Sequence, residues 1–172
     1  RTYINGNSDL EELIRNDDID IIICATSGFA GLKATHIAAS TGKKILLANK
    51  ESIVAGGDLV LPIAKEYDSQ IVPIDSEHNA IFQCLSGENG TGDVQKITIT
   101  ASGGPFLNST ISELKDVTID QALNHPNWKM GSKVTIDSAT LVNKCLELIE
   151  AKYLFNLEEK YFELVVHPQS II

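Results

Sequence analysis

Three short apolar runs, separated by segments of helical length, constrain the fold of this chain more than any other feature. They are "DIDIIICA" (18–25), "KKILLA" (43–48) and "QIVPID" (70–75). Runs of this length that are apolar on both faces are typical of strands in a parallel sheet. Between the first two runs, residues 31–42 carry small and apolar residues at helical spacing and finish on Gly42, a residue that commonly ends a helix.

The next segment, residues 49–68, is also expected to be helical in part, although Gly56, Gly57 and Pro62 weaken it. Strand, helix, strand, helix and strand in this order predict an α/β fold, with half of a doubly wound, Rossmann-like parallel sheet. Ligands of such sheets bind outside the carboxyl ends of the strands. The strand tails "TSG", "ANKES" and "DSEHN" are therefore the first places to look for chemistry.

The pattern changes after residue 82, which predicts a second, α+β part. "KITITASGGPF" (96–106) predicts a strand that ends in glycines, and residues 107–133 are polar and mixed. "SATLVNKCLELIEAKYLF" (138–155) predicts one long helix, and "FELVVHP" (162–168) predicts a last strand.

Two carboxylates follow the third apolar run. In an extended segment Asp75 and Glu77 project to the same face, and Ser76 points the other way. Carboxylates this close repel unless a cation lies between them, and hard oxygen ligands suit Mg²⁺ or Mn²⁺. The alternative is that Asp75 or Ser76 caps a following helix with an acidic first turn. The stretch by itself favours the cap.

A second group of polar residues lies in "DSATLVNKCLE" (137–147). Thr140, Asn143, Lys144 and Glu147 have the spacing of one helical stripe. Ser138 lies near the start of the expected helix. Its hydroxyl, the backbone amides there and the donors of the next turn suit a phosphate. Glu147 on the same stripe suits a metal. The alternative is a solvent-exposed face with a Lys144–Glu147 ion pair.

Two loop-like segments carry further candidates. In "TASGGPF" (100–106), Ser102 precedes two glycines, which suits either a close backbone approach to a ligand or a common turn. "NHPNWKMG" (124–131) contains His125, Trp128 and Met130. It predicts either a buried tryptophan or a lid that lays an indole ring over a small ligand.

Composition excludes several classes of protein. The chain has 14 Lys and Arg against 23 Asp and Glu, a net charge of −9, which argues against a nucleic-acid binder. Cys24, Cys84 and Cys145 form no CxxC pair and suggest neither a zinc site nor a disulfide framework. No apolar stretch has the length needed to span a bilayer, so we expect no membrane partner.

The motifs "LLANKES", "PIDSEHNAIFQ", "ASGGPF", "HPNWKMG", "IDSATLVNKCLELIEA" and "VVHPQSII" occur in an order that resembles the 1-deoxy-D-xylulose 5-phosphate reductoisomerase family of the non-mevalonate isoprenoid pathway. The resemblance implies an NADPH-dependent oxidoreductase that rearranges 1-deoxy-D-xylulose 5-phosphate and reduces the product to 2-C-methyl-D-erythritol 4-phosphate. It also implies a need for Mg²⁺, Mn²⁺ or Co²⁺.

The resemblance assigns roles to individual residues. The implied metal ligands are Asp75, Glu77 and Glu147, which with Lys144 and His125 also make up the implied catalytic set. The implied contacts to the sugar phosphate substrate are Ser76, Ser102, His125, Trp128, Ser138, Asn143 and Lys144. The implied cofactor contacts are Asn49, Lys50, Glu51 and Met130.

The family's glycine-rich pyrophosphate turn and its closing helical domain have no counterpart in the chain. The resemblance therefore implies that residues 1–76 are the latter part of an NADPH-binding domain. Residues 77–172 are then a catalytic domain truncated before the C-terminal helical domain. We expect this segment to be inactive alone and the parent enzyme to be a homodimer in a bacterial cytoplasm or a plastid-type organelle. The alternatives are another NAD(P)-linked sugar oxidoreductase without a metal, and a non-catalytic interaction module.

Overall fold

The computed structural model describes residues 9–87 and 90–171, and the chain divides into two compact units, Arg1–Gly90 and Thr91–Ile172. The helix that follows the third strand belongs to the first unit because it contacts that strand. The predicted boundary between a cofactor domain and a catalytic domain, after Ser76, concerns function and stays a prediction.

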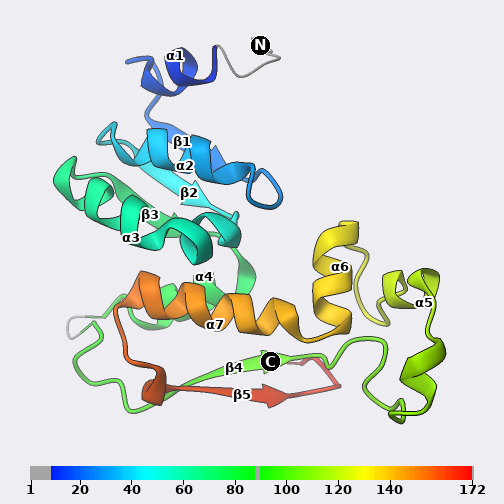
Figure 1. The fold of residues 1–172 in the computed structure, drawn as a ribbon. Coiled ribbons are helices and arrows are strands. Elements are labelled where there is room, and N and C mark those ends of the chain that lie inside the picture. The colour runs from blue at the N-terminus through cyan, green and yellow to red at the C-terminus, as the bar shows by residue number, and fades with distance from the viewer. Residues whose placement is uncertain (1–8, 88–89, 172) are drawn as a thin grey trace. The chain divides into compact units, whose positions relative to one another are not determined.

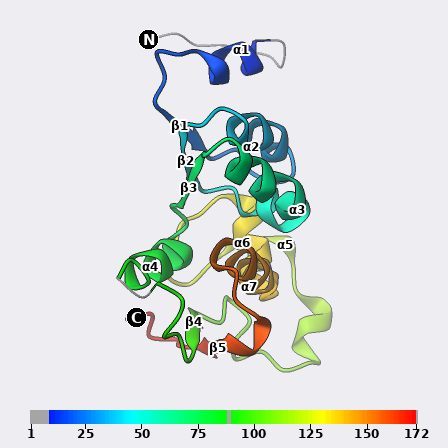
Figure 2. The same ribbon diagram turned by 90° about the vertical axis from the view of Figure 1, so that its left-hand side faces the viewer.

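The first unit contains the predicted parallel sheet. Strands β1 (Ile21–Cys24), β2 (Lys44–Leu47) and β3 (Gln70–Pro73) pair in the order β1-β2-β3, with all pairings parallel. Helices α2 (Gly31–Ala39) and α3 (Lys50–Glu66) make the two crossovers and lie on the same face of the sheet (Figure 2). The unit also includes α1 (Leu10–Arg15) and α4 (Ser76–Cys84). The predicted Rossmann-like half is thus confirmed.

The core of the first unit forms where the central strand meets the two crossover helices. Its fully buried apolar side chains are Ile45 and Leu47 of β2, Ile53 and Val60 of α3, and Ala38 and Ala39 of α2. Helices α2 and α3 approach closely at Gly56, where an added Cβ would lie 2.5 Å from Cδ1 of Leu32. Gly56 also leaves the helical conformation, so α3 is kinked there. The glycine that weakens the helix in the sequence therefore permits the close packing.

Helix α2 ends earlier than the sequence predicts. Its last residue is Ala39, and Gly42 lies beyond it in a turn with a φ of +72°, a conformation that glycine adopts at little cost. The amide of Gly42 donates to Oγ of Ser69, which precedes β3. Gly42 thus shapes the turn into β2 and does not end the helix directly.

The second unit contains the parallel pair β4 (Ile97–Ala101) and β5 (Phe162–Val166), both predicted. Its helices are α5 (Ile119–Leu123), α6 (Ser132–Ala139) and α7 (Val142–Phe155), with 3₁₀ turns η1 (Glu113–Asp116) and η2 (Glu159–Tyr161). Helix α7 runs alongside the two strands (Figure 1). Within the described residues, no helix is both long and apolar enough to cross a bilayer.

The prediction of a single helix over 138–155 is wrong. Leu141 has a φ of +60°, which breaks the segment into α6 and α7. Ser138 therefore lies in the last turn of α6 and not at a helix start, and Thr140 is the residue after α6 and not part of the α7 stripe. The Thr140 hydroxyl donates to the carbonyls of Ile136 and Asp137, which satisfies carbonyls that a helix end leaves open.

Candidate active site

The ends of β1 and β2 are joined by Asn49, the residue that caps α3. Its Oδ1 accepts a hydrogen bond from the amide of Ser52 at 3.0 Å. Its Nδ2 donates to the carbonyls of Thr26 at 2.5 Å and Gly28 at 2.9 Å, in the loop after β1. A Cβ on Gly31 would lie 2.6 Å from the Asn49 side chain, so this arrangement needs a glycine there. The tails of β1 and β2, two of the places singled out in the sequence, are thus in direct contact.

The ends of β2 and β3 are joined by an ion pair. The Nζ of Lys50 lies 2.7 Å from Oδ2 of Asp75, and Nδ1 of His78 lies 3.6 Å from the same oxygen. Burial raises the pKa of Asp75, but the nearby imidazole of His78 and the ammonium of Lys50 outweigh it and hold that pKa well below its usual range. Asp75 is therefore a carboxylate at neutral pH.

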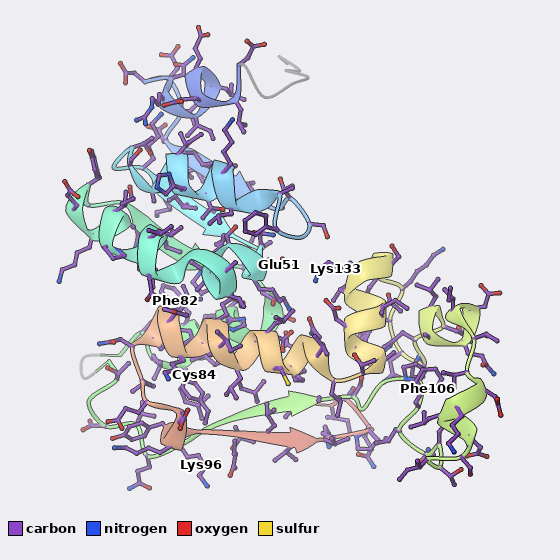
Figure 3. The ribbon with its side chains drawn as sticks, viewed as in Figure 1. Glu51, Phe82, Cys84, Lys96, Phe106 and Lys133 are labelled. Carbon is purple, nitrogen blue, oxygen red and sulfur yellow. The ribbon has the colours of Figure 1, made fainter. Side chains whose placement is uncertain are left out.

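Glu51 completes the polar group at this edge of the sheet. It lies at the N-terminal end of α3 (Figure 3), and its Oε2 accepts from Nδ2 of Asn49 at 2.8 Å. Asn49, Lys50 and Glu51, three of the four predicted cofactor contacts, thus lie together where the strands end. The contact with a cofactor itself stays a prediction.

Asp75 is the N-cap residue of α4, as the capping alternative predicts. Its Oδ1 accepts from the amide of Ser76 at 3.1 Å, and the Ser76 hydroxyl donates to Oε2 of Glu77 at 2.7 Å. Because β3 ends at Pro73 and α4 begins at Ser76, the argument that alternation along a strand puts Asp75 and Glu77 on one face is wrong. The cap uses Oδ1 of Asp75, and Oδ2 is the oxygen that pairs with Lys50.

In the second unit, the loop after β4 packs against the end of α6. Lys96 and Phe106 mark the two ends of this strand-and-loop segment (Figure 3), and Ser102 lies just after the strand. A Cβ on Gly104, which has a φ of +70°, would lie 2.7 Å from the carbonyl oxygen of Ser138. The segments of Ser102 and Ser138, distant in the sequence, are thus in direct contact, although Ser138 is not at a helix N-terminus.

The stripe on α7 is buried and internally paired. Glu147 is 1% exposed, and its two oxygens accept from Nδ2 of Asn143 at 2.5 Å and from Nζ of Lys144 at 2.6 Å. The predicted grouping of these three side chains on one helix face is confirmed. The alternative is half right: its Lys144–Glu147 ion pair is confirmed, but its solvent-exposed face is wrong because both residues are buried.

The segment between α5 and α6 places apolar side chains in solvent. Trp128 is 54% exposed and Met130 is 36% exposed, so the expectation of a buried tryptophan is wrong. An exposed indole on a loop fits the lid alternative. His125 in the same segment is buried, and its ring contacts Ser102, as described further below.

The candidate metal ligands suit a hard divalent cation by their chemistry, since all three are carboxylates and oxygen ligands are those that Mg²⁺ and Mn²⁺ prefer. Asp75 and Glu77 belong to the first unit and Glu147 to the second. Sequence reasoning missed the contacts of Lys50 and His78 with Asp75. For His78 the only available signal was its spacing of three residues from Asp75 on a predicted helix.

Comparisons with known proteins agree on one family. A family model described as 1-deoxy-D-xylulose 5-phosphate reductoisomerase matches residues 1–57, and a model of the C-terminal domain of the same enzyme matches residues 71–155. The chain is 52% identical over 167 residues to the 1-deoxy-D-xylulose 5-phosphate reductoisomerase of Pelotomaculum thermopropionicum, covering 97% of this chain and 43% of that protein. With the Chloroherpeton thalassium enzyme it is 52% identical over 169 residues, covering 98% and 43%.

Solved structures give the same result. A crystal structure of DOX-P reductoisomerase in complex with NADPH, fosmidomycin and magnesium superposes with a TM-score of 0.90 at 47% identity, covering 96% of this chain and 43% of that one. The Zymomonas mobilis enzyme in complex with NADPH superposes with a TM-score of 0.84 at 46% identity, covering 95% and 41%. The chain thus spans well under half the length of the relatives that it matches.

Proposed function

Because the chain belongs to the 1-deoxy-D-xylulose 5-phosphate reductoisomerase family, we propose that it supplies the metal- and phosphate-binding residues of an enzyme that converts 1-deoxy-D-xylulose 5-phosphate to 2-C-methyl-D-erythritol 4-phosphate with NADPH. The observation that carries the proposal is the position and the ionised state of Asp75. Asp75 is an ionised carboxylate at the end of a parallel strand, where α/β sheets bind ligands.

Asp75, Glu77 and Glu147 are the proposed ligands of Mg²⁺, Mn²⁺ or Co²⁺. A bound divalent ion polarises substrate oxygens and stabilises negative charge that develops on them. Lys50 and His78 keep Asp75 ionised, and the cap geometry fixes one of its oxygens against the Ser76 amide. The carboxylate is thus already in the protonation state that a metal requires.

Ser102, Ser138, Asn143 and Lys144 are the proposed donors to the substrate's phosphate. The contact of Gly104 with the Ser138 carbonyl supports a shared site for the two serines. Asn143 and Lys144 bind Glu147 in the described structure and would divide their donors between this carboxylate and a phosphate. Local donors of this kind let a chain of net charge −9 bind an anion.

NADPH is the proposed reductant, with Asn49, Lys50, Glu51 and Met130 as contacts, and Ser76 and Trp128 are proposed to contact the substrate. Residues 1–76 are proposed to be the latter part of the cofactor domain, and residues 77–172 part of the catalytic domain. The enzyme is proposed to act as a homodimer. Structures of relatives in complex with NADPH, and with fosmidomycin and magnesium, support the small-molecule part of this proposal.

The test is turnover by the intact protein, followed as NADPH consumption in the presence of 1-deoxy-D-xylulose 5-phosphate and Mg²⁺. Asp75→Asn, Glu77→Gln and Glu147→Gln should each lower kcat by about 100-fold or more, because each removes a charged metal ligand and keeps its shape. Glu163→Gln, which removes an exposed carboxylate on β5, is the matched control and should leave kcat within about twofold.

Other outcomes separate the alternatives. A metal-independent sugar oxidoreductase would keep its turnover in Glu147→Gln and in the presence of a chelator. A non-catalytic module would show neither turnover nor binding of 1-deoxy-D-xylulose 5-phosphate in the unchanged protein. Either result would overturn the proposal.

A further inference from the structure

His125 is held by hydrogen bonds on both sides of its ring. It lies in the segment between α5 and α6 and is 8% exposed. Its Nδ1 accepts from the backbone amides of Asn127 at 3.2 Å and Trp128 at 3.1 Å. Its Nε2 lies 3.1 Å from Oγ of Ser102. The ring thus bridges the segment that carries Trp128 and the loop that follows β4.

These contacts determine where the ring carries its proton. Backbone amides only donate, so Nδ1 must present its lone pair to Asn127 and Trp128. The proton of the neutral imidazole is then on Nε2, and Nε2–H donates to Ser102. Burial lowers the pKa of His125, which favours this neutral form over the imidazolium.

The tautomer in turn determines what Ser102 can do. Its oxygen accepts from Nε2–H of His125 and lies 3.4 Å from the amide of Gly104. A hydroxyl has two lone pairs and one proton, so with both lone pairs facing donors the proton must point elsewhere. No acceptor for it is found among residues 9–87 and 90–171. Ser102 is therefore set as a donor, the role that a phosphate or phosphonate oxygen requires.

We propose that His125 is a positioning residue, which fixes Ser102 as a hydrogen-bond donor to the anionic group of the ligand and ties that orientation to the Asn127–Trp128 turn. The identity of the anion rests on the proposed function. The position of the proton on the His125 ring and the hydrogen bond to Ser102 do not depend on the proposed function. A direct contact of a His125 ring nitrogen with substrate would require one of these internal hydrogen bonds to break.

The first test is spectroscopic and needs no ligand. In the intact protein with ¹⁵N-labelled histidine, long-range proton–nitrogen correlations should show His125 as the neutral Nε2–H tautomer. Ser102→Ala should shift the Nε2 signal and leave the Nδ1 signal nearly in place. An Nδ1–H tautomer, or an Nε2 signal that does not respond to Ser102→Ala, would overturn the proposal.

The second test measures binding of fosmidomycin in the presence of Mg²⁺ by calorimetry. Ser102→Ala and His125→Asn should each weaken binding about tenfold, since each loses one oriented hydrogen bond to a charged group. The double variant should be no weaker than either single one, because both changes remove the same donor. His125→Gln, whose amide nitrogen can take the place of Nε2–H, should recover most of the affinity.

Additive losses in the double variant would contradict positioning, because they would mean that His125 and Ser102 bind the ligand independently. Unfolding temperatures of all four variants identify losses that come from misfolding, and His125→Gln serves where His125→Asn is unstable. If the unchanged protein does not bind fosmidomycin, the proposed function fails, and the spectroscopic test still decides the positioning role.

Discussion

At the scale of single residues, Lys50 and Asp75 form the most consequential pair in the first unit. They connect the ends of β2 and β3, and Lys50 is buried. A lysine in this position does two things at once, since it neutralises a carboxylate and joins two strand ends.

Replacing Lys50 with methionine tests this role. Lys50→Met keeps the apolar stem but leaves Asp75 without its ammonium partner, which should cost about 1–3 kcal/mol of unfolding free energy. Urea unfolding provides the measurement. Lys65→Met, an exposed position on the same helix, is the matched control and should change stability by less than about 0.5 kcal/mol. Equal losses in the two variants would show that the pair does not stabilise the fold.

The lowered pKa of Asp75 predicts a pH dependence of stability. Its folded-state pKa lies below the unfolded value of about 3.9, so its contribution is complete above that value and is lost as the pH falls through the folded-state pKa. Asp75→Asn removes the titration and keeps a good N-cap residue. The stability difference between the unchanged protein and Asp75→Asn should be constant from about pH 6 to 8 and shrink below about pH 4. Urea unfolding at several pH values measures it, and a difference that persists undiminished at pH 2 would contradict the argument.

At the scale of elements, the break between α6 and α7 is set by the left-handed conformation of Leu141. Leu141 is 40% exposed, so its side chain gains little from packing to offset the backbone conformation. Leu141→Ile should lower stability by about 1–2 kcal/mol, because a β-branched residue tolerates positive φ poorly, whereas Leu141→Gly should be neutral or stabilising. Thermal unfolding measures both changes.

The control for this prediction is Val142→Ile, an exposed position one residue further on that begins α7. Valine is already β-branched, so this change adds only one methylene where φ is helical and should change the unfolding temperature little. A loss in Leu141→Gly as large as that in Leu141→Ile would mean that the leucine side chain, and not its backbone conformation, holds the two helices in place.

The same break shows where sequence reasoning ends. The three strands and two crossover helices of the first unit could be predicted because apolar runs and glycines mark their ends. Leu141 gives no such signal, since leucine is a strong helix former and only its surroundings force the left-handed conformation. For the same reason the sequence predicts an anion site at a helix start near Ser138, although Ser138 lies in the last turn of α6.

Part of the candidate site could likewise be predicted from the sequence, and part could not. Asn143, Lys144 and Glu147 could be grouped because helical spacing brings them together on α7. The contacts Lys50–Asp75 and Ser102–His125 join segments that are far apart along the chain, and periodicity within a segment carries no information about them. The cap at Asp75 could be predicted, but the ion pair with Lys50, which keeps the Asp75 carboxylate ionised, could not.

At the scale of the whole molecule, binding of a metal should be visible as stabilisation, independent of turnover. A ligand at 100 times its dissociation constant stabilises the folded state by about 2.7 kcal/mol. Mn²⁺ should therefore raise the unfolding temperature of the intact protein, and Asp75→Asn, Glu77→Gln and Glu147→Gln should each reduce this rise. Glu163→Gln should keep it, and an unchanged rise in all three amide variants would contradict the proposed ligand set.

The hydrogen bonds that join the strand ends of the first unit also constrain the order in which it folds. Asn49 reaches Thr26 across 23 residues, and Lys50, which follows β2, pairs with Asp75, which follows β3. Parallel strands cannot be closed by a hairpin, so these contacts form only after the crossover helices have packed, and such long-range pairing is slow. A slip of β2 by one residue would turn Asn49 and Lys50 away from their partners. A chain in the wrong register therefore lacks these contacts at the strand ends, and their formation indicates that the sheet has reached its native pairing.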